Sequence, residues 1–388
     1  MRIGYVYELQ AYPPRGGNHR HAYEITQRLI DLGHEVAVLD DPTMPRAHHY
    51  DSQQAGGLEA FVEACEVLCL RIDARFLGNL PRIQQCMALA GERPVVWEIN
   101  APASEALAFS WLGGRTSNRR ESPVRWLRRW FHAARQKGRI HREEQLRKQL
   151  ASQVAAAICV SSALEGYARW LGIGETLMLP NGGPLLSQEE IQRRRSRRRD
   201  PRFTVLYSGS ALYPWQGLNY LADTIRLARH RAPDMHFVIA TNQQSEYVPQ
   251  GDNVTVIEGL DREGILDAIC CADACVALPP EHFWLPYGFH GSPMKLFEYM
   301  ACGTAVVTSR LGQMKELLRD GEDALLCDNH PEDILNKLMQ LQARPERASQ
   351  LGMAGWQRIQ QELNWPENAR RTAGLLQSLL DRQSSPAP

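Results

Sequence analysis

A short helix after a glycine-containing loop is the part of this sequence best suited to hold an anionic ligand. Ser292 is a preferred helix N-cap residue, Pro293 fits the first helical position, and Gly303 is suited to end the helix. These residues predict a helix that starts at Pro293 and is capped by Ser292. Gly288 and Gly291, which precede it, would allow the loop to approach a ligand closely.

The first turn of this predicted helix has the groups that a nucleotide requires. Backbone amides at Met294 and Lys295, with the positive end of the helix dipole, form a site for a diphosphate. The ammonium of Lys295 adds a full positive charge there. Glu298 lies on the same helix face, where its carboxylate could accept hydrogen bonds from the diol of a ribose. The simpler alternative is that Lys295 and Glu298 form an ion pair on a surface helix.

Short apolar strands alternate with helices in two successive series along the chain. They are expected at residues 3–7, 34–39, 67–70, 95–99, 156–160, 203–207, 235–240, 254–257, 274–278 and 305–308. Apolar runs of this kind are typical of parallel strands that are buried on both faces. The pattern predicts an α/β fold with two doubly wound, Rossmann-like domains that face each other across a cleft, with ligands at the carboxyl ends of the strands.

A polar segment separates the two series. It begins with turn-forming residues at 180–184 and contains an arginine-rich run at 193–199. We place the domain boundary after residue 182, so that the domains cover residues 1–182 and 183–362. The arginine run is interpreted as an exposed linker loop.

The composition is that of an ordinary globular protein of 388 residues, long enough for two or three domains. Its 44 basic and 44 acidic residues cancel, so a preference for polyanions would have to come from local clusters. The nine cysteines show no Cys-x-x-Cys pair beside histidine ligands, and we expect free thiols in a reducing compartment. No Asp-x-Asp motif or other cluster has metal-ligand spacing, so no metal is expected.

A basic insertion at about residues 113–150 interrupts the first series. Between Arg115 and Lys148 it contains twelve Arg or Lys and three Glu. Its large apolar residues include Trp126, Leu127, Trp130 and Phe131. One interpretation is a solvated helical hairpin whose aromatic side chains pack on the domain. The other is a basic surface that contacts anionic lipid head groups or a lipid-linked acceptor.

Neither a membrane span nor a nucleic-acid-binding module is recognisable. The N-terminus lacks the apolar core of a signal peptide, and no uncharged stretch approaches the roughly 18 residues needed to span a bilayer. We therefore expect a cytoplasmic protein, associated with the cytoplasmic face of a membrane if the basic insertion binds lipid. Nucleic-acid binding is not expected, because no recognised module accompanies the basic charge.

Over nearly its whole length the sequence resembles glycosyltransferase family 4, whose members are retaining enzymes of the GT-B fold. The family's donor signature ends in a Glu, a helix of small residues and a Gly before a strand, which matches Glu298 to Gly303 and the apolar run that follows. The family usually has a second Glu with seven residues between the two, and here that position is His290. The match is to a subgroup in which Ser-Pro-x-Lys, here Ser292 to Lys295, precedes the remaining Glu. The resemblance implies that Glu298 binds the donor ribose.

Three other stretches match the family in order and spacing. Residues 13–17, with Gly16 and Gly17, are similar to the glycine loop beneath the donor diphosphate. Residues 179–182 resemble the segment that closes the first domain, and residues 160–162 precede a helix as in the family.

Departures from the family pattern also affect the predicted site. An Arg and a Lys commonly clamp the donor diphosphate, and here Ser210 and Gln216 stand in their places. Lys295 must then carry more of the neutralisation, because charge-assisted contacts to phosphate are the stronger ones. A His near the reacting sugar is replaced by Asn100, whose amide cannot shuttle a proton. Asn100 would orient a sugar hydroxyl, or it only braces the turn that follows it.

Two further residues are placed near the donor. His290 either contacts the sugar or simply lies on the loop, and Arg262 follows a strand where this fold usually meets the nucleotide base. Residues 363–388 are expected to form a helix that packs back on the first domain.

The resemblance implies a retaining transferase that moves a sugar from a nucleotide-sugar donor, held by the second domain, to a hydroxyl acceptor bound by the first. The leaving diphosphate would itself take the proton of the acceptor hydroxyl. The acceptor would be a glycan or a lipid-linked molecule, in glycan, polysaccharide or glycolipid biosynthesis, and the nucleotide sugar would be a co-substrate with no other cofactor. Two alternatives stay open: a non-catalytic or partner-dependent nucleotide-sugar-binding subunit, and a nucleotide-sugar epimerase on the same fold.

Overall fold

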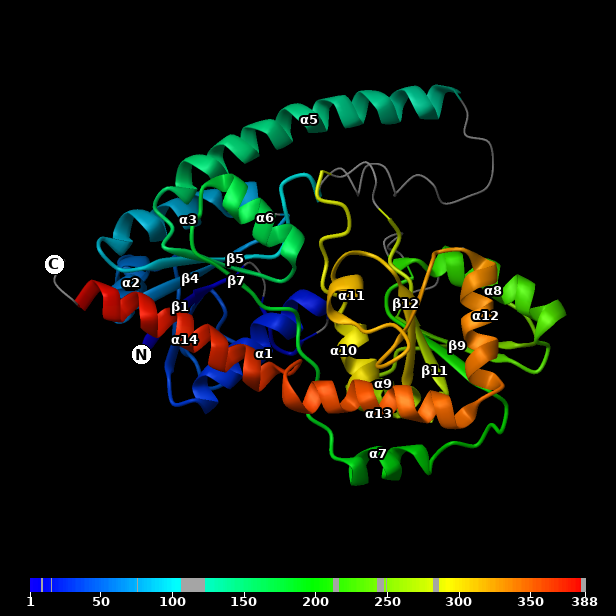
Figure 1. Ribbon diagram of the computed structural model, residues 1–388. Coiled ribbons are helices and arrows are strands. Elements are labelled where there is room, and N and C mark those ends of the chain that lie inside the picture. The colour runs from blue at the N-terminus through cyan, green and yellow to red at the C-terminus, as the bar shows by residue number, and fades with distance from the viewer. Residues whose placement is uncertain are drawn as a thin grey trace.

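The computed structural model describes residues 1–384 apart from residues 8–9, 15, 75, 106–122, 212–215, 243–247, 249 and 282–285, and apart from the side chains of residues 123–130 and 132–134. Two parallel β-sheets form two domains that lie side by side (Figure 1). This is the predicted architecture of two Rossmann-like domains.

The first domain contains a seven-stranded parallel sheet of order β3-β2-β1-β4-β5-β6-β7. Its strands are β1 (Arg2–Val6), β2 (Glu35–Leu39), β3 (His48–Tyr50), β4 (Val67–Ile72), β5 (Val95–Ile99), β6 (Ala156–Cys159) and β7 (Thr176–Met178). Its helices are α1 (Gly17–Asp31), α2 (Gly57–Ala64), α3 (Phe76–Ala90), α5 (Pro123–Ala151) and α6 (Ser162–Leu171). Every predicted strand of this series is present, whereas β3 and β7, which are three residues long and only partly buried, were not predicted.

The second domain contains a six-stranded parallel sheet of order β10-β9-β8-β11-β12-β13. Its strands are β8 (Thr204–Ser208), β9 (His236–Thr241), β10 (Val254–Glu258), β11 (Ala274–Ala277), β12 (Ala305–Ser309) and β13 (Leu325–Cys327). Its helices are α8 (Leu218–Arg231), α9 (Arg262–Cys271), α10 (Met294–Ala301), α11 (Gly312–Leu317), α12 (Pro331–Gln342) and α13 (Pro345–Gln361). The central strands β8, β11 and β12 are buried throughout, because helices cover both faces of the sheet.

The last helix, α14 (Trp365–Ser384), returns to the first domain and lies along α1 (Figure 1). Trp365 and Leu376 share an apolar core with residues of α1 and β1. The outgoing linker passes the same place, since a Cβ on Gly182 would lie 2.6 Å from the backbone nitrogen of Trp365. A Cβ on Gly183 would lie 2.7 Å from the carbonyl oxygen of Phe297 in α10. The two domain crossings therefore meet beside α10.

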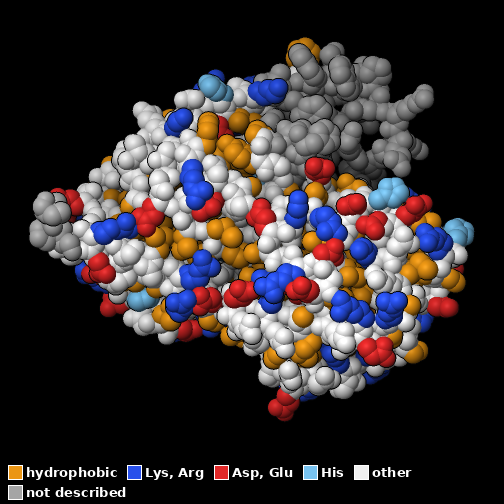
Figure 2. Space-filling view, in the orientation of Figure 1, with side chains coloured by type: hydrophobic (Ala, Val, Ile, Leu, Met, Phe, Trp, Pro, Cys, Tyr) orange, Lys and Arg blue, Asp and Glu red, His pale blue; other side chains and the backbone are white. Residues whose placement is uncertain are grey.

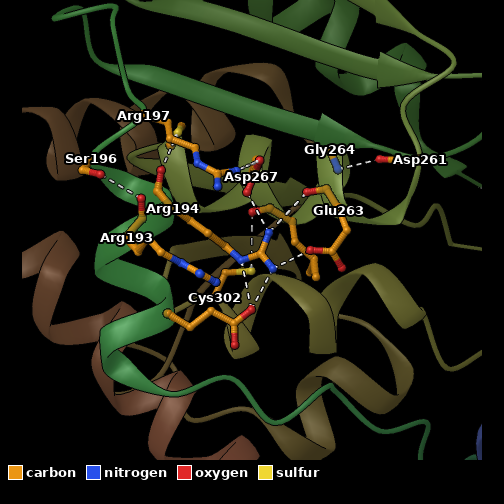
Figure 3. Close-up of polar contacts among 12 residues, drawn as sticks. Arg193, Arg194, Ser196, Arg197, Asp261, Glu263, Gly264, Asp267 and Cys302 are labelled. Atoms are coloured by element: carbon orange, nitrogen blue, oxygen red, sulfur yellow. Dashed lines mark hydrogen bonds and ion pairs between the residues drawn. The ribbon is translucent and has the colours of Figure 1, made fainter.

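The arginine-rich linker is not an exposed loop, which corrects that interpretation. Residues 188–195 form α7 (Gln188–Arg195), and the Arg194 side chain is buried. Its guanidinium pairs with carboxylates of Glu190 at 2.7 Å, Glu263 at 2.6 Å and Asp267 at 2.7 Å (Figure 3). Two of these carboxylates, Glu263 and Asp267, lie on α9, so the sequence near Arg194 gives no indication of them. Through these ion pairs Arg194 holds α7 against α9.

The basic insertion is one helix of 29 residues in its described part, so the expected hairpin is wrong there. The carboxyl-terminal half of α5 packs near α3 and α6, and the other half projects from the body (Figure 1). Arg147 anchors it, because this fully buried guanidinium donates to the carbonyl oxygens of Ala101 at 2.8 Å and Asp73 at 2.7 Å and pairs with Glu143 at 2.6 Å. Residues 113–122 and the side chains of Trp126, Leu127 and Trp130 lie outside the described residues. In the part of the chain that is described, no helix combines the length and apolarity needed to cross a membrane.

Candidate active site

Helix α10 lies beside the sheet of the second domain, and its start differs from the prediction. Met294 is its first residue and Pro293 is the N-cap, with no hydrogen bond from a capping side chain. Ser292 is not the N-cap, because its hydroxyl instead accepts a hydrogen bond from the backbone nitrogen of Asn181 at 2.9 Å. No capping side chain therefore competes with a ligand for the amides of the first turn. At the other end, Gly303 follows the helix with φ +63°, as a C-terminal glycine should.

Lys295 points from the first turn of α10 toward the end of β8. Its Nζ is buried without a hydrogen-bond partner among the described residues and lies 4.0 Å from the ring centre of Tyr207. A Cβ on Gly209, which has φ +144°, would lie 2.6 Å from this Nζ and 3.4 Å from Oε1 of Gln216. Glycine is thus required at position 209 both for its backbone conformation and for the space that the ammonium occupies.

The electrostatics of Lys295 follow from this confinement. Burial lowers the pKa of Lys295 to about 7, although the nearby carboxylate of Glu298 favours the charged form. A buried ammonium ordinarily has acceptors for its three donors. This one is instead available to an anion that comes from outside the protein.

Glu298 lies one turn further along α10 in a group of charges that involves both domains. Burial raises the pKa of Glu298, and the cations that oppose this are, in order of effect, Arg262, Arg20 and Lys295. Arg20 belongs to α1 of the first domain, while Arg262 begins α9 of the second. Arg262 also lies 3.9 Å from Glu24 of α1, so a carboxylate of the first domain faces the second.

The glycine loop brings a second helix start to the same place. Gly16 is the N-cap of α1 and makes no side-chain cap. A Cβ on Gly17 would lie 3.4 Å from Sδ of Met294, so the amino-terminal ends of α1 and α10 are in contact range. Asn100, after β5, donates from Nδ2 to Oδ1 of Asn18 at 3.2 Å, which holds it beside the first turn of α1.

His290 bridges the two domains. Its Nε2 lies 3.4 Å from Oε1 of Glu105, and its Nδ1 lies 3.3 Å from the carbonyl oxygen of Gly288. Its own carbonyl accepts a hydrogen bond from the Ser161 hydroxyl at 2.7 Å. The neighbouring Gly291 lies against the ring of Phe289. The imidazole is therefore buried between the domains rather than displayed on a loop.

The structure thus brings most of the predicted residues together where the two domains meet. Gly16, Gly17 and Asn100 come from the first domain, and Gln216, Arg262, Met294, Lys295 and Glu298 come from the second. Ser210 lies in the loop after β8, where its carbonyl oxygen accepts from the Tyr207 hydroxyl at 3.0 Å. Ser292 contacts Asn181 of the linker rather than capping α10, and Pro293 is the N-cap of that helix. No metal-ligand cluster of three His, Cys, Asp or Glu occurs within the described ranges.

Four residues that lie in or directly behind this site were not found from the sequence: Arg20, His21, Glu24 and Tyr207. The first three follow Gly16 and Gly17 in the first two turns of α1, and helix residues directly after a glycine loop were an available signal. Tyr207 had none, because an aromatic residue in a buried strand is usually only part of the core.

A known protein family matches most of the second domain. Residues 202–344 match the family described as glycosyl transferases group 1. Over these residues the second domain is similar to that family. The matched residues include Tyr207, Gln216, Arg262 and all of α10, so the residues around Lys295 that come from the second domain lie within this similarity.

One relative matches a part of the sequence, and solved structures match nearly the whole chain. A stretch of 82 residues is 35% identical to alpha-maltose-1-phosphate synthase of Mycolicibacterium smegmatis and covers 19% of this chain and 21% of that protein, about a fifth of its length. Sucrose-phosphate synthase from Thermosynechococcus elongatus matches with a TM-score of 0.70 at 17% identity, over 98% of this chain and 99% of that one. Anabaena HepE in complex with UDP-glucose matches with a TM-score of 0.65 at 15% identity, over 97% and 100%. These matches show that both domains together have the GT-B fold.

Proposed function

We propose that this chain is a retaining glycosyltransferase that moves a sugar from a nucleotide-sugar donor to a hydroxyl acceptor. The observation that carries the proposal is the buried Nζ of Lys295, which lacks an acceptor and lies at the amino-terminal end of α10. A diphosphate placed there would receive the ammonium and the free amides of the first turn together. HepE, a structural neighbour with the same fold, has been observed with UDP-glucose, which supports a donor of this class.

The roles of the other residues follow from their positions. Glu298, three residues after Lys295, would accept hydrogen bonds from the donor ribose, and Arg262 would contact the base. Gly16 and Gly17 would let the first turn of α1 approach the diphosphate from the opposite side. Asn100 would hold a sugar hydroxyl, since its amide can donate and accept but cannot take up a proton.

Transfer with retention requires that the acceptor attack the face of the sugar from which the diphosphate leaves. The bond from the anomeric carbon to the diphosphate oxygen breaks as the bond to the acceptor oxygen forms, and the acceptor proton goes to the departing oxygen. Charge builds up on that oxygen, where Lys295 and the helix amides would stabilise it. The burial of Lys295 strengthens this effect, because water does not screen the buried ammonium.

Two variants test the assignment. We expect Glu298→Gln and Lys295→Ala to abolish transfer while far-ultraviolet circular dichroism and the cooperative thermal transition remain. Lys337→Ala, on α12 of the same domain, is the matched control and should retain wild-type turnover. Normal turnover in either site variant would contradict the assignment.

The donor can be identified by a thermal-shift screen of UDP-, GDP- and ADP-sugars, because a ligand that binds only the folded state raises Tm by mass action. A specific donor should raise the Tm of the wild type and, at the same concentration, raise that of Lys295→Ala much less. If a donor binds but no lipid or glycan acceptor supports turnover, the chain is a nucleotide-sugar-binding subunit, which the departures at Ser210, Gln216 and Asn100 favour. If the protein converts the nucleotide sugar to its epimer when no acceptor is present, the chain is a nucleotide-sugar epimerase rather than a transferase.

We also infer that α5 contacts an anionic membrane surface, where a lipid-linked acceptor would be found. Arg135, Lys137, Arg139 and Arg142 are exposed along it, and Phe131 is 61% exposed. Basic residues near a lipid surface contribute about 1 kcal/mol each. Co-sedimentation with phosphatidylserine vesicles should be lost on exchange of Arg139 and Arg142 for Glu, and equal binding to pure phosphatidylcholine vesicles would contradict the inference.

A further inference from the structure

A buried chain of hydrogen bonds connects the sheet of the first domain to the start of α10. Glu98 on β5 accepts hydrogen bonds from the Tyr5 hydroxyl at 2.5 Å and from the guanidinium of Arg71. The same carboxylate lies 3.0 Å from Nε2 of His21 on α1. Nδ1 of His21 lies 2.7 Å from Oδ1 of Asn181, in the linker between the domains. The chain therefore passes through both nitrogens of one imidazole.

Asn181 connects this chain to the donor helix. Its backbone nitrogen donates to the Ser292 hydroxyl at 2.9 Å, and its Nδ2 donates to the Ser292 carbonyl oxygen at 2.6 Å. Ser292 is two residues before Met294, the first residue of α10. Movement of Asn181 would thus move the backbone that enters the diphosphate site.

The partners of His21 determine where its protons are. A carbonyl oxygen only accepts, so the amide nitrogen of Asn181 must face Ser292 and its Oδ1 must face His21. Nδ1 of His21 therefore carries a hydrogen. The carboxylate of Glu98 already accepts from the Tyr5 hydroxyl and pairs with the guanidinium of Arg71, so it too is an acceptor toward His21. Nε2 of His21 must then carry a hydrogen as well, which makes the ring an imidazolium.

The surroundings of His21 contain few other charges. Arg71 from β4 and Glu98 from β5 are the charged groups of the chain, and the pKa of Tyr5 from β1 is raised by burial and by Glu98, so its hydroxyl stays a donor. The ring of Trp365 at the start of α14 lies edge-on to the imidazole, 5.4 Å between centres. The side chains of His21, Glu98 and Asn181 are all buried, with exposed fractions of 8% or less. Loss of a proton from His21 would therefore place a lone pair opposite an oxygen, with no water to intervene.

We propose that His21 is a positioning residue that, as an imidazolium, fixes Asn181 and through it Ser292, and so holds the first turn of α10 in place for the donor. It touches neither the donor nor the acceptor. The proposal rests on the proposed function only for the identity of the ligand at α10. It states that when His21 loses a proton, the backbone at the start of α10 moves.

The direct test is nuclear magnetic resonance without any donor. In protein labelled with ¹⁵N-histidine and ¹³C-methyl methionine, both ring nitrogens of His21 should be protonated at neutral pH, and the Met294 methyl signal should shift with the midpoint at which His21 loses a proton. The measurement is made in the Lys295→Gln protein, so that the Lys295 ammonium does not itself titrate beside Met294. Signals are assigned from their loss in His21→Gln and Met294→Leu. A singly protonated His21 at neutral pH, or a Met294 signal that ignores its titration, would overturn the proposal.

The substitution Asn181→Asp tests the two ends of this run of hydrogen bonds separately: the contact with His21 and the contact with Ser292. An aspartate keeps an acceptor for Nδ1 of His21 but offers no donor to the Ser292 carbonyl. His21 should stay doubly protonated, Met294 should no longer follow its titration, and the donor KM should rise about tenfold with a smaller change in kcat. Titration of His230, exposed at the end of α8, is the control and should leave Met294 unmoved.

Failure of the proposed function gives a different result from failure of this proposal. If no nucleotide sugar binds the wild type, the function is wrong, while the coupling of His21 to Met294 is still measured without ligand. If nucleotide sugars bind and Asn181→Asp has the wild-type KM with Met294 still coupled, the positioning role is wrong and the function stands.

Discussion

Two buried cations of the second half of the chain differ in their partners. Arg194 on α7 is surrounded by three carboxylates within 2.7 Å (Figure 3). Lys295 on α10 has a buried Nζ with a tyrosine ring 4.0 Å away and no acceptor among the described residues. Arg194 is satisfied by the protein itself, whereas the ammonium of Lys295 would, under the proposed function, receive its acceptor from the donor diphosphate.

We interpret this difference as one of role: Arg194 stabilises the fold, and Lys295 is the proposed ligand-binding charge. A buried ion with partners holds elements together, here the linker helix and α9, and one without partners makes the free protein less stable. Sequence alone points the other way, because the arginine run looks like solvated charge and a Lys three residues before a Glu looks like an ion pair. The face shown in Figure 2 mixes basic and acidic side chains, so local geometry rather than a broad surface field distinguishes these two cations.

The largest expected effect is the loss of stability in Arg194→Ala. Removal of the guanidinium leaves three carboxylates facing one another, and the free energy of unfolding should fall by about 3 kcal/mol. Urea denaturation measures it. Arg382→Ala, which removes an exposed partner of Glu175 at 2.7 Å, should change stability by about 0.5 kcal/mol or less. Equal effects of the two substitutions would show that Arg194 is not a clamp.

The second effect is on donor affinity. Lys295→Met removes a charge-assisted contact to the diphosphate and should weaken donor binding by about 10- to 100-fold, since such hydrogen bonds contribute about 1.5–3 kcal/mol. Isothermal titration calorimetry with the donor from the thermal-shift screen measures it. Arg194→Ala, if it remains folded at the assay temperature, should bind the donor within a few-fold of wild type, because its contacts lie away from the candidate active site. Unchanged affinity in Lys295→Met would contradict the contrast between the two cations.

The third and smallest effect is a gain of stability in Lys295→Met without donor. Near pH 7 and below, the methionine protein should be the more stable by about 1 kcal/mol, because no buried charge has to be desolvated. Between about pH 7 and the higher pKa of an exposed lysine, the unfolded wild type binds one more proton than the folded form. Wild-type stability therefore rises with pH relative to the variant, by at most about 1.4 kcal/mol per pH unit. Urea denaturation at pH 6, 7.5 and 9 tests this, and a pH-independent difference would be contrary to it.

Periodic features of the sequence predicted the fold well. Continuous apolar runs located the central strands of both sheets, because parallel strands covered on both faces must be apolar throughout. The short edge strands β3 and β7 carry no such run, and β13, which was also not predicted, is an apolar run of only three residues. The pairing of all three depends on a neighbour already in place. For the same reason α7 and α5 were misread, since what orders Arg194 and Arg147 is distant in sequence.

The candidate site was predicted only in its local part. Lys295 and Glu298 lie within one helix, where spacing fixes which side chains share a face, and Pro293 and Gly303 lie directly beside its two ends. The partner of Ser292 could not be predicted, because Asn181 is 111 residues away and reaches it through the linker. The tyrosine beneath Lys295 and the arginine of α1 near Glu298 likewise come from other elements, and only the packing of two domains brings them together.

The most direct test of the account is whether donor binding gives Lys295 a proton. Calorimetric titration of the nucleotide sugar at pH 8, in buffers of different ionisation enthalpy, measures the protons taken up. The account predicts uptake approaching one proton in the wild type, because an ammonium whose pKa is held at about 7 regains its charge against a diphosphate, and none in Lys295→Met where binding is still measurable. A binding heat that is the same in every buffer would contradict it.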